Sequence, residues 1–306
     1  MSPMDIVDDS PMCIYTAGSG DWCPQNYDKK FKGQITLTQA LAESRNIPAV
    51  VVSEAVGRDL VKQVATDFGL ATNFADGPAL ALGVSESTLI DMTGAFAGIL
   101  NGGSSVTPYG LQALKLKGMD EPLFGAGGGI GERVISEGAA RALTYMMAEV
   151  LNSGTGGRAR LDDREAAGKT GTTQSARDAW FVGFTADYVV GVWMGYDDNS
   201  PLTGVTGGGL PAEIWHEVMV RINEGVDPKP LITEIPESTY VPVDPSTTEG
   251  AVLPEDVPYF DDPNAPSYDG VPVLDGPPPE GSVNLGPVEG NGGDLAGQIN
   301  DLLGID

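Results

Sequence analysis

Histidine and cysteine are scarce in this sequence, and long apolar runs are absent. A zinc site or a histidine-based triad needs more than His216 and two cysteines, so we expect no metal ion and no other cofactor. His216 itself falls in a helical pattern, which favours a packing or surface role. No stretch approaches the ~20 apolar residues of a membrane-spanning helix. The first residues also lack the basic and apolar segments of an export signal, so neither feature is expected in these 306 residues.

Positive charge is also scarce: 17 Lys and Arg stand against 43 Asp and Glu, for a net charge of −26. A field of that sign repels phosphate backbones, so we expect no nucleic-acid partner. No basic residue follows Lys229, while acids continue to Asp306. We expect a folded domain over residues 1–223 and a largely disordered acidic tail rich in Pro and Gly over 224–306. Within that tail only Asp294–Leu303 has weak amphipathic character.

The segment of about 1–35 is rich in turns, with short β-like pieces such as Met12–Tyr15. It contains both cysteines, Cys13 and Cys23, with two glycines between them. This spacing is typical of a hairpin that a disulfide closes in an oxidising compartment. Two unlinked thiols fit the spacing equally well, and the sequence leaves both interpretations open.

Helical periodicity predicts four helices, over Arg58–Phe68, Thr88–Leu100, Glu137–Leu151 and Pro211–Ile222. A further helix starts at Thr36 and should stop near Asn46, because Pro48 disfavours helix at Ile47. Pro48 then suits the first turn of a new helix through Val56.

The second half of the chain also contains strand patterns. Glu165–Thr173 is a predicted strand, followed by two apolar runs over Ala179–Thr185 and Tyr188–Met194. Two residues separate these runs, which predicts an antiparallel hairpin. Their lack of alternation indicates strands covered on both faces.

Gly168-Lys169-Thr170 first suggests a phosphate-binding loop. That motif requires a glycine five residues earlier, and the residue there is Asp163. A charged turn precedes the triplet, whereas a phosphate loop follows an apolar strand, so a nucleotide site is not expected. The glycine run Gly125–Gly131 fails the dinucleotide spacing as well and is predicted to be a flexible loop.

The same residues suit a strand at the edge of an acyl-transfer cleft, from Lys169 to Thr173. Lys169 places a cation beside a substrate carboxylate. Thr170 and Thr172 point to one face at a period of two, so both hydroxyls are available to that carboxylate. Gly171 permits close approach of the substrate, and the N–H of Thr172 suits an oxyanion hole.

In this order, several segments make the chain resemble the class A, bifunctional penicillin-binding proteins over about residues 5–222. The resembling segments are Ile6–Pro11, Ala40–Val50, Ala81–Ser85, Gly154–Gly156, Ala166–Thr173, Arg177–Thr185 and Gly191–Asp198. The resemblance implies an α/β (α+β) fold of the serine β-lactamase/D,D-transpeptidase type. That fold has a five-stranded antiparallel sheet with helices on both faces.

The family uses three motifs, of which two match here. Ser44-Arg45-Asn46 matches Ser-x-Asn, and the resemblance implies that Ser44 relays a proton while Asn46 binds the peptide stem. Lys169-Thr170-Gly171 matches the third motif. The first, Ser-x-x-Lys, supplies the nucleophile, and no serine in this chain has lysine three residues later. In the family that motif, a glycosyltransferase domain and a membrane anchor all lie upstream, so we expect an N-terminally truncated transpeptidase domain that is inactive alone.

The resemblance implies a parent that crosslinks peptidoglycan by serine acyl transfer at D-Ala-D-Ala ends. Its partners would be stem peptides, β-lactams and other cell-wall synthesis proteins, with membrane contact only through the missing anchor. Full-length members work on the periplasmic side of the inner membrane. A non-catalytic peptidoglycan-binding remnant is the main alternative. A β-lactamase-like hydrolase is the other, although the acidic tail and the strands around Trp180 and Trp193 favour the synthase.

Overall fold

The computed structural model describes residues 1–16, 20–70, 73–125, 127–173 and 176–235. All of them fall within one compact unit that spans Met1–Val243. The predicted tail from residue 236 onward, including Asp294–Leu303, lies outside the described residues.

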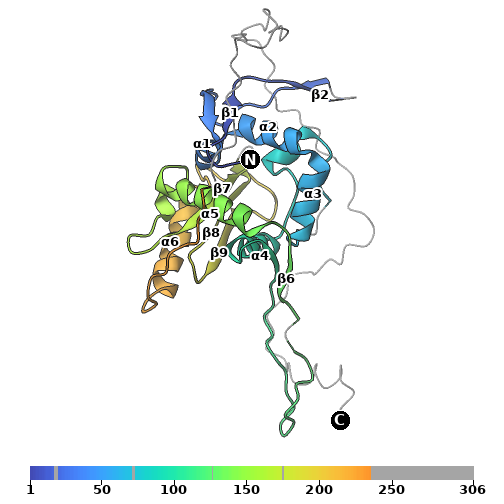
Figure 1. Cartoon of the computed structure of the whole chain (residues 1–306), viewed down its shortest axis with the longest axis vertical. Helices are drawn as coiled ribbons and strands as arrows, with labels where there is room; N and C mark the ends of the chain where they lie inside the picture. The colour runs from blue at the N-terminus through green and yellow to red at the C-terminus, as the bar shows by residue number, and fades with distance from the viewer. Residues whose placement is uncertain (17–19, 71–72, 126, 174–175, 236–306) are drawn as a thin grey trace, which may run out of the picture. The chain divides into compact units, whose positions relative to one another are not determined.

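The central sheet consists of β7 (Ala167–Thr172), β8 (Asp178–Phe184) and β9 (Val189–Gly195), in that order and antiparallel throughout (Figure 1). The predicted strand before the hairpin and the hairpin itself are confirmed. Within the described residues this sheet has three strands, not the five that the resemblance implies.

Helices cover both faces of the sheet, as expected. On one face Phe181 of β8 packs with Trp215 and Met219 of α6 (Leu210–Ile222). On the other face Phe184 packs against α4 (Leu89–Leu100) and α5 (Glu137–Asn152). These buried aromatic and aliphatic side chains hold the sheet rigidly in place.

The expectation that both hairpin strands are covered on both faces is correct, since α4 and α6 contact β9 as well as β8, but β9 is less buried than β8. The residues of β9 are half-buried at best, and Trp193 is 39% exposed. The reason is topological, because among the described strands none pairs with the outer edge of β9.

The N-terminal region forms two small antiparallel pairs. They are β1 (Ile6–Asp9) with β4 (Gly33–Thr36), and β2 (Ile14–Thr16) with β3 (Gly20–Trp22). A disulfide joins Cys13 to Cys23 across the second pair, so the bridged interpretation holds in this structure.

The first predicted helix boundary is wrong. Helix α1 covers Leu37–Ala42, and α2 covers Asn46–Val56 with Ile47 inside it. Pro48 is therefore the third residue of α2, where the helix needs no hydrogen bond from its nitrogen. The turn between α1 and α2 contains Ser44, and its geometry matters for the site below.

The other helices lie close to their predicted ranges. They are α3 (Arg58–Asp67), α4, α5 and α6, with two 3₁₀ turns, η1 (Pro78–Leu82) and η2 (Gly157–Ala159). His216 lies on α6 with Nδ1 3.0 Å from the Arg160 carbonyl oxygen, which agrees with a packing role.

The predicted flexible glycine loop is partly wrong. Gly129–Arg133 forms β6, which pairs with β5 (Ser104–Thr107). Backbone pairing with β5 supplies the order that the glycine composition alone does not suggest. A long loop that extends away from the helices connects β5 to β6 (Figure 1).

The packed part of the chain runs past the expected boundary at residue 223. Leu231 is buried beside Phe184 and Met147, and its N–H donates to Glu165 Oε2 at 2.8 Å. Lys229 pairs with Asp187. One apolar side chain and one ion pair thus hold the first dozen residues of the acidic segment against the domain.

Candidate substrate-binding site

The turn after α1 places Ser44 in an unusual backbone conformation. Ser44 has φ of 56°, in the left-handed region. The Arg45 N–H donates to the Ala40 carbonyl at 2.9 Å, and the Ser44 N–H donates to the Leu41 carbonyl at 3.1 Å. This is the Schellman pattern of helix ends, in which the left-handed position is usually glycine. A serine there carries backbone strain that its surroundings must offset.

Lys169 of β7 meets that serine across 125 residues of sequence. Its Nζ donates to Ser44 Oγ at 2.6 Å and to its neighbour's carbonyl, that of Thr170, at 3.0 Å. Burial lowers the pKa of Lys169 from 10.5 to about 8, because the charged form loses hydration. In the described part of the chain, no carboxylate forms an ion pair with this ammonium group.

The strand register separates Lys169 from the two threonines. Lys169 lies opposite Val182 and Thr170 opposite Phe181, so their side chains point to opposite faces. Thr170 and Thr172 share a face, as predicted. Each hydroxyl already has a partner within the chain: Thr170 Oγ1 lies 2.7 Å from Thr155 Oγ1, and Thr172 Oγ1 accepts from the Gly207 N–H at 3.0 Å.

The main chain of Thr172 has the orientation that an oxyanion hole needs. The Thr173 N–H donates to the Asp178 carbonyl at 3.0 Å. Bonded and non-bonded pairs alternate along an antiparallel ladder, so the Thr172 N–H faces away from β8. It therefore points toward the edge of β7 that pairs with none of the described strands.

The glycine-containing loop that follows α5 forms hydrogen bonds both to the end of α1 and to β7. The Thr155 N–H donates to the Ala42 carbonyl at 3.0 Å, while the Thr155 hydroxyl contacts Thr170. A Cβ at Gly154 would lie 2.1 Å from the Ala42 carbonyl oxygen, so only glycine fits there. The serine turn, this loop and β7 thus converge on one place.

Two predicted site residues, Asn46 and Thr173, lie at the margins of the site. Asn46 donates its side-chain amide to the Gln25 carbonyl at 2.7 Å and has no hydrogen bond to Ser44 or Lys169 within the described residues. Thr173 Oγ1 accepts from the Asp178 N–H at 2.8 Å at the end of the strand pairing.

Sequence reasoning missed Gly207 and Gly208. A Cβ at Gly207 would lie 2.4 Å from the Gly171 carbonyl oxygen, and one at Gly208 would lie 2.3 Å from that of Thr155. These glycines press directly on the threonine face of β7. The run of three glycines before α6 was the available signal, because such a run permits close backbone approach.

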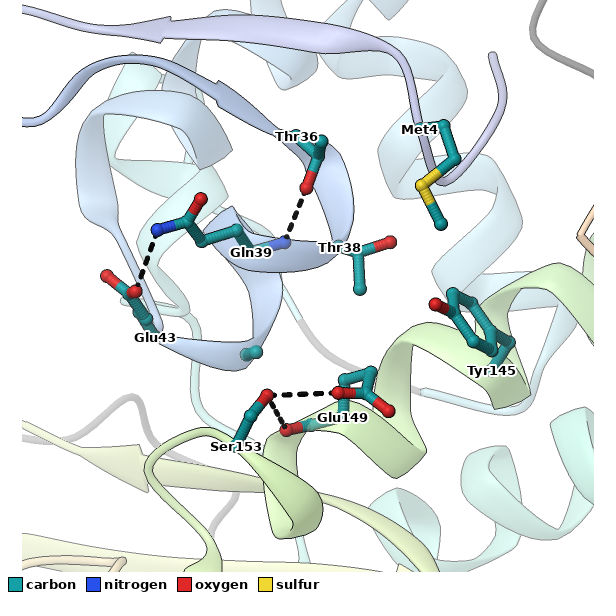
Figure 2. Close-up of a pocket in the computed structure, with 9 residues that line it drawn as sticks. Met4, Thr36, Thr38, Gln39, Glu43, Tyr145, Glu149 and Ser153 are labelled. Carbon is teal, nitrogen blue, oxygen red and sulfur yellow. Dashed lines mark hydrogen bonds between the residues drawn. The ribbon is translucent and has the colours of Figure 1, made fainter.

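A hollow of about 360 Å³ lies nearby, between α1 and α5 (Figure 2). Several of its polar side chains bond within the chain, for example Gln39 to Glu43 and Ser153 to Glu149, while Thr38 donates to the Pro3 carbonyl at 2.8 Å. None of the predicted site residues lines it, so the hollow is separate from the serine–lysine pair. Within the described residues no group of three or more metal-ligating side chains is arranged for a metal ion, and no helix is long and apolar enough to cross a membrane.

Comparison with known proteins identifies the family. The model of the penicillin-binding protein transpeptidase domain matches residues 1–220. The chain belongs to this family. The match covers both segments of the serine–lysine pair, and it confirms the resemblance seen in the motifs.

Individual relatives agree with this assignment. Penicillin-binding protein 1A of Aquifex aeolicus is 36% identical over 221 residues, which cover 72% of this chain and 30% of that protein. Penicillin-binding protein 1A from Haemophilus influenzae superposes with a TM-score of 0.67 at 25% identity, over 77% of this chain and 41% of that one. The PonA1 protein from Mycobacterium tuberculosis in complex with penicillin V gives a TM-score of 0.67 at 23% identity, over 80% and 70%, and supports the fold alone. The chain spans about a third of the length of its curated relatives.

Proposed function

We propose that this chain forms the carboxylate-binding side of a D,D-transpeptidase site. Its ligands are D-Ala-D-Ala ends of peptidoglycan stems and β-lactams. The observation that carries the proposal is the contact between Lys169 and Ser44, because it brings two family motifs within hydrogen-bonding distance. The similar PonA1 protein was solved with penicillin V, which supports a β-lactam as a probe for this fold.

The pair has a definite chemical use. Lys169, with a pKa of about 8, is mostly protonated at neutral pH and offers its charge to a ligand carboxylate. Because Lys169 donates to Ser44 Oγ, the serine hydroxyl proton is free to pass to a leaving nitrogen. The Thr172 N–H, facing the strand edge, would stabilise the oxyanion. The Thr170 and Thr172 hydroxyls lie on the other face of β7 from Lys169 and would contact the ligand where it crosses the strand edge.

The attacking serine is the component we do not find. No serine in the 306 residues is followed by lysine at the third position. Full-length members of the family would crosslink stems by serine acyl transfer on the periplasmic side of the inner membrane, among cell-wall synthesis partners. This chain on its own would bind such ligands without becoming acylated.

Two assays on the purified chain test the proposal. Incubation with a fluorescent penicillin, followed by denaturing electrophoresis, should leave no labelled band. Calorimetric titration with penicillin V should show reversible binding that Lys169→Ala abolishes. Lys229→Ala is the matched control, since Lys229 is an exposed lysine paired with Asp187. A labelled band that maps to a serine, or undiminished binding by Lys169→Ala, would overturn the proposal.

A further inference from the structure

A buried carboxylate lies at the end of β1, close to the serine turn. Asp9 is fully buried, and both of its oxygens are engaged. Oδ2 accepts from Arg45 Nε at 2.9 Å and from the Lys32 N–H at 3.1 Å, while Oδ1 accepts from Asn26 Nδ2 at 2.6 Å. A buried charge held by this many donors fixes its partners firmly.

Arg45 connects this carboxylate to the residue that follows Ser44. Its guanidinium is almost completely buried and bonds Asp9 on one side and Asp28 Oδ2, at 3.0 Å, on the other. A third bond goes to the Lys30 carbonyl. The planar guanidinium therefore joins β1 and the loop before β4 to the serine turn.

Asn26 holds the other side of the turn. Its Oδ1 accepts from the Asn46 N–H at 2.8 Å and lies 3.4 Å from the Ile47 nitrogen. These are the first N–H groups of α2, and Arg45 at the N-cap position provides no side-chain cap of its own. Asn26 thus caps α2 from outside the helix.

The side chain of Ser44 has a single hydrogen bond in the described residues, between its Oγ and Lys169. The φ of Ser44, at 56°, is strained. The residues beside it are held by buried polar groups on two other segments. The position of the hydroxyl is therefore set by its neighbours.

We propose that Asp9, Asn26 and Arg45 are positioning residues that hold the strained turn so that Ser44 Oγ stays in contact with Lys169. The importance of that contact for ligand binding rests on the proposed function. The positioning itself is a separate claim, and its readout does not need a ligand.

The readout is the pKa of Lys169, followed by NMR in protein labelled with ¹³C-lysine. The native value should lie near 8. In Asn26→Ala the turn loosens, water reaches Nζ, and the pKa should rise by about one unit toward its ordinary value. Affinity for penicillin V should fall about tenfold, because the cation is less well placed.

Asn223→Ala is the matched control. Asn223 is equally buried, bonds the Met219 carbonyl, and accepts from an arginine, Arg164, far in sequence from the turn. It should lose comparable thermal stability and leave the pKa of Lys169 unchanged. A purely structural role for Asn26 would make the two variants alike.

If Asn26→Ala does not fold, the pKa of Lys169 is measured in Arg45→Lys instead. This variant retains a positive charge beside Asp9 and removes the bonds to Asp28 and Lys30. A smaller rise in the pKa of Lys169 is expected. If the pKa stays at the native value in every folded variant, the positioning proposal is overturned. If the native chain binds no penicillin V while the pKa still shifts, the proposed function fails and the positioning role stands.

Discussion

The serine turn and the lysine strand each contain a cation, and the two cations differ in whether carboxylates of the chain pair with them. Arg45, beside the serine, is enclosed by two aspartates and a carbonyl. Lys169, on the edge strand β7, is partly buried and has a hydroxyl and a carbonyl as its only hydrogen-bond partners in the described residues. The first cation is neutralised within the protein, whereas the second remains available for an anion from outside.

The comparison shows how one site combines rigidity with binding. A buried charge with complete partners stabilises a specific geometry, and removing one partner is costly. A buried charge without a counterion destabilises the protein, but it also attracts a ligand carboxylate. The Thr155 loop connects the two regions through Ala42 and Thr170.

The largest expected effect is on the serine side. Asp9→Ala leaves the Arg45 guanidinium short of its fully buried partner and should cost about 3–5 kcal/mol in the free energy of unfolding. Chemical denaturation followed by circular dichroism measures the loss. The control is Asp163→Ala, an exposed partner of Arg164 whose removal should cost less than about 1 kcal/mol. Equal losses in the two variants would show that the buried pair is not special.

Gly154→Ala tests the connection between the two regions. The new Cβ would collide with the Ala42 carbonyl oxygen, and relief of that contact should cost about 2–3 kcal/mol. Gly157→Ala is the matched control, because its Cβ would lie 3.9 Å from the nearest atom, the Leu151 oxygen. Thermal unfolding of both variants should separate them clearly. A tolerated Gly154→Ala would mean that the loop and α1 are not in close contact.

Replacing Lys169 by methionine should change the free energy of unfolding by less than the two substitutions above, and it should stabilise the protein. The pKa of Lys169 falls from 10.5 to about 8 on folding, so the unfolded chain holds the extra proton between these values. Stability from this lysine therefore rises with pH through that window, and its buried charge costs about 3 kcal/mol below pH 8. After the loss of its hydrogen bonds, of about 1 kcal/mol, Lys169→Met should stabilise the protein by about 2 kcal/mol at pH 7.

That gain should shrink as the pH rises above 8 and reach zero before pH 10.5, at the pH where about 1 kcal/mol of charge cost remains. Above pH 10.5 only the loss of the hydrogen bonds remains, so Lys169→Met should be less stable than the native protein by about 1 kcal/mol. Denaturation of both proteins at several pH values measures this difference. A variant that is less stable than the native protein at pH 7 would contradict the view that Lys169 is an uncompensated buried charge.

Much of the fold was predictable, because apolar periodicity and capping residues report burial directly. Helices α3 to α6 and the β8–β9 hairpin follow their patterns closely. The end of α1 was not, since the Schellman turn uses Ser44 where glycine would have signalled it. The edge position of β9 in the described sheet also escaped prediction, because the sequence does not show which strands pair with it.

The candidate site was predictable in its parts and not in its assembly. The motifs located Ser44 and Lys169, and the strand period correctly put Thr170 and Thr172 on one face. Nothing in the spacing showed that the Thr170 hydroxyl would hydrogen-bond Thr155 or that the Thr172 hydroxyl would accept from Gly207. The network around Asp9 depends on side chains that converge from three segments, which only the folded chain brings together.

The most direct test of the account is an NMR titration of Lys169 with and without saturating penicillin V. The lysine should titrate near pH 8 in the free protein. Bound carboxylate favours the charged ammonium, so the ligand should raise this pKa by at least about one unit. A lysine that titrates near 10.5 in the free protein, or one whose pKa does not respond to the ligand, would contradict the claim that Lys169 is held without a counterion for an external carboxylate.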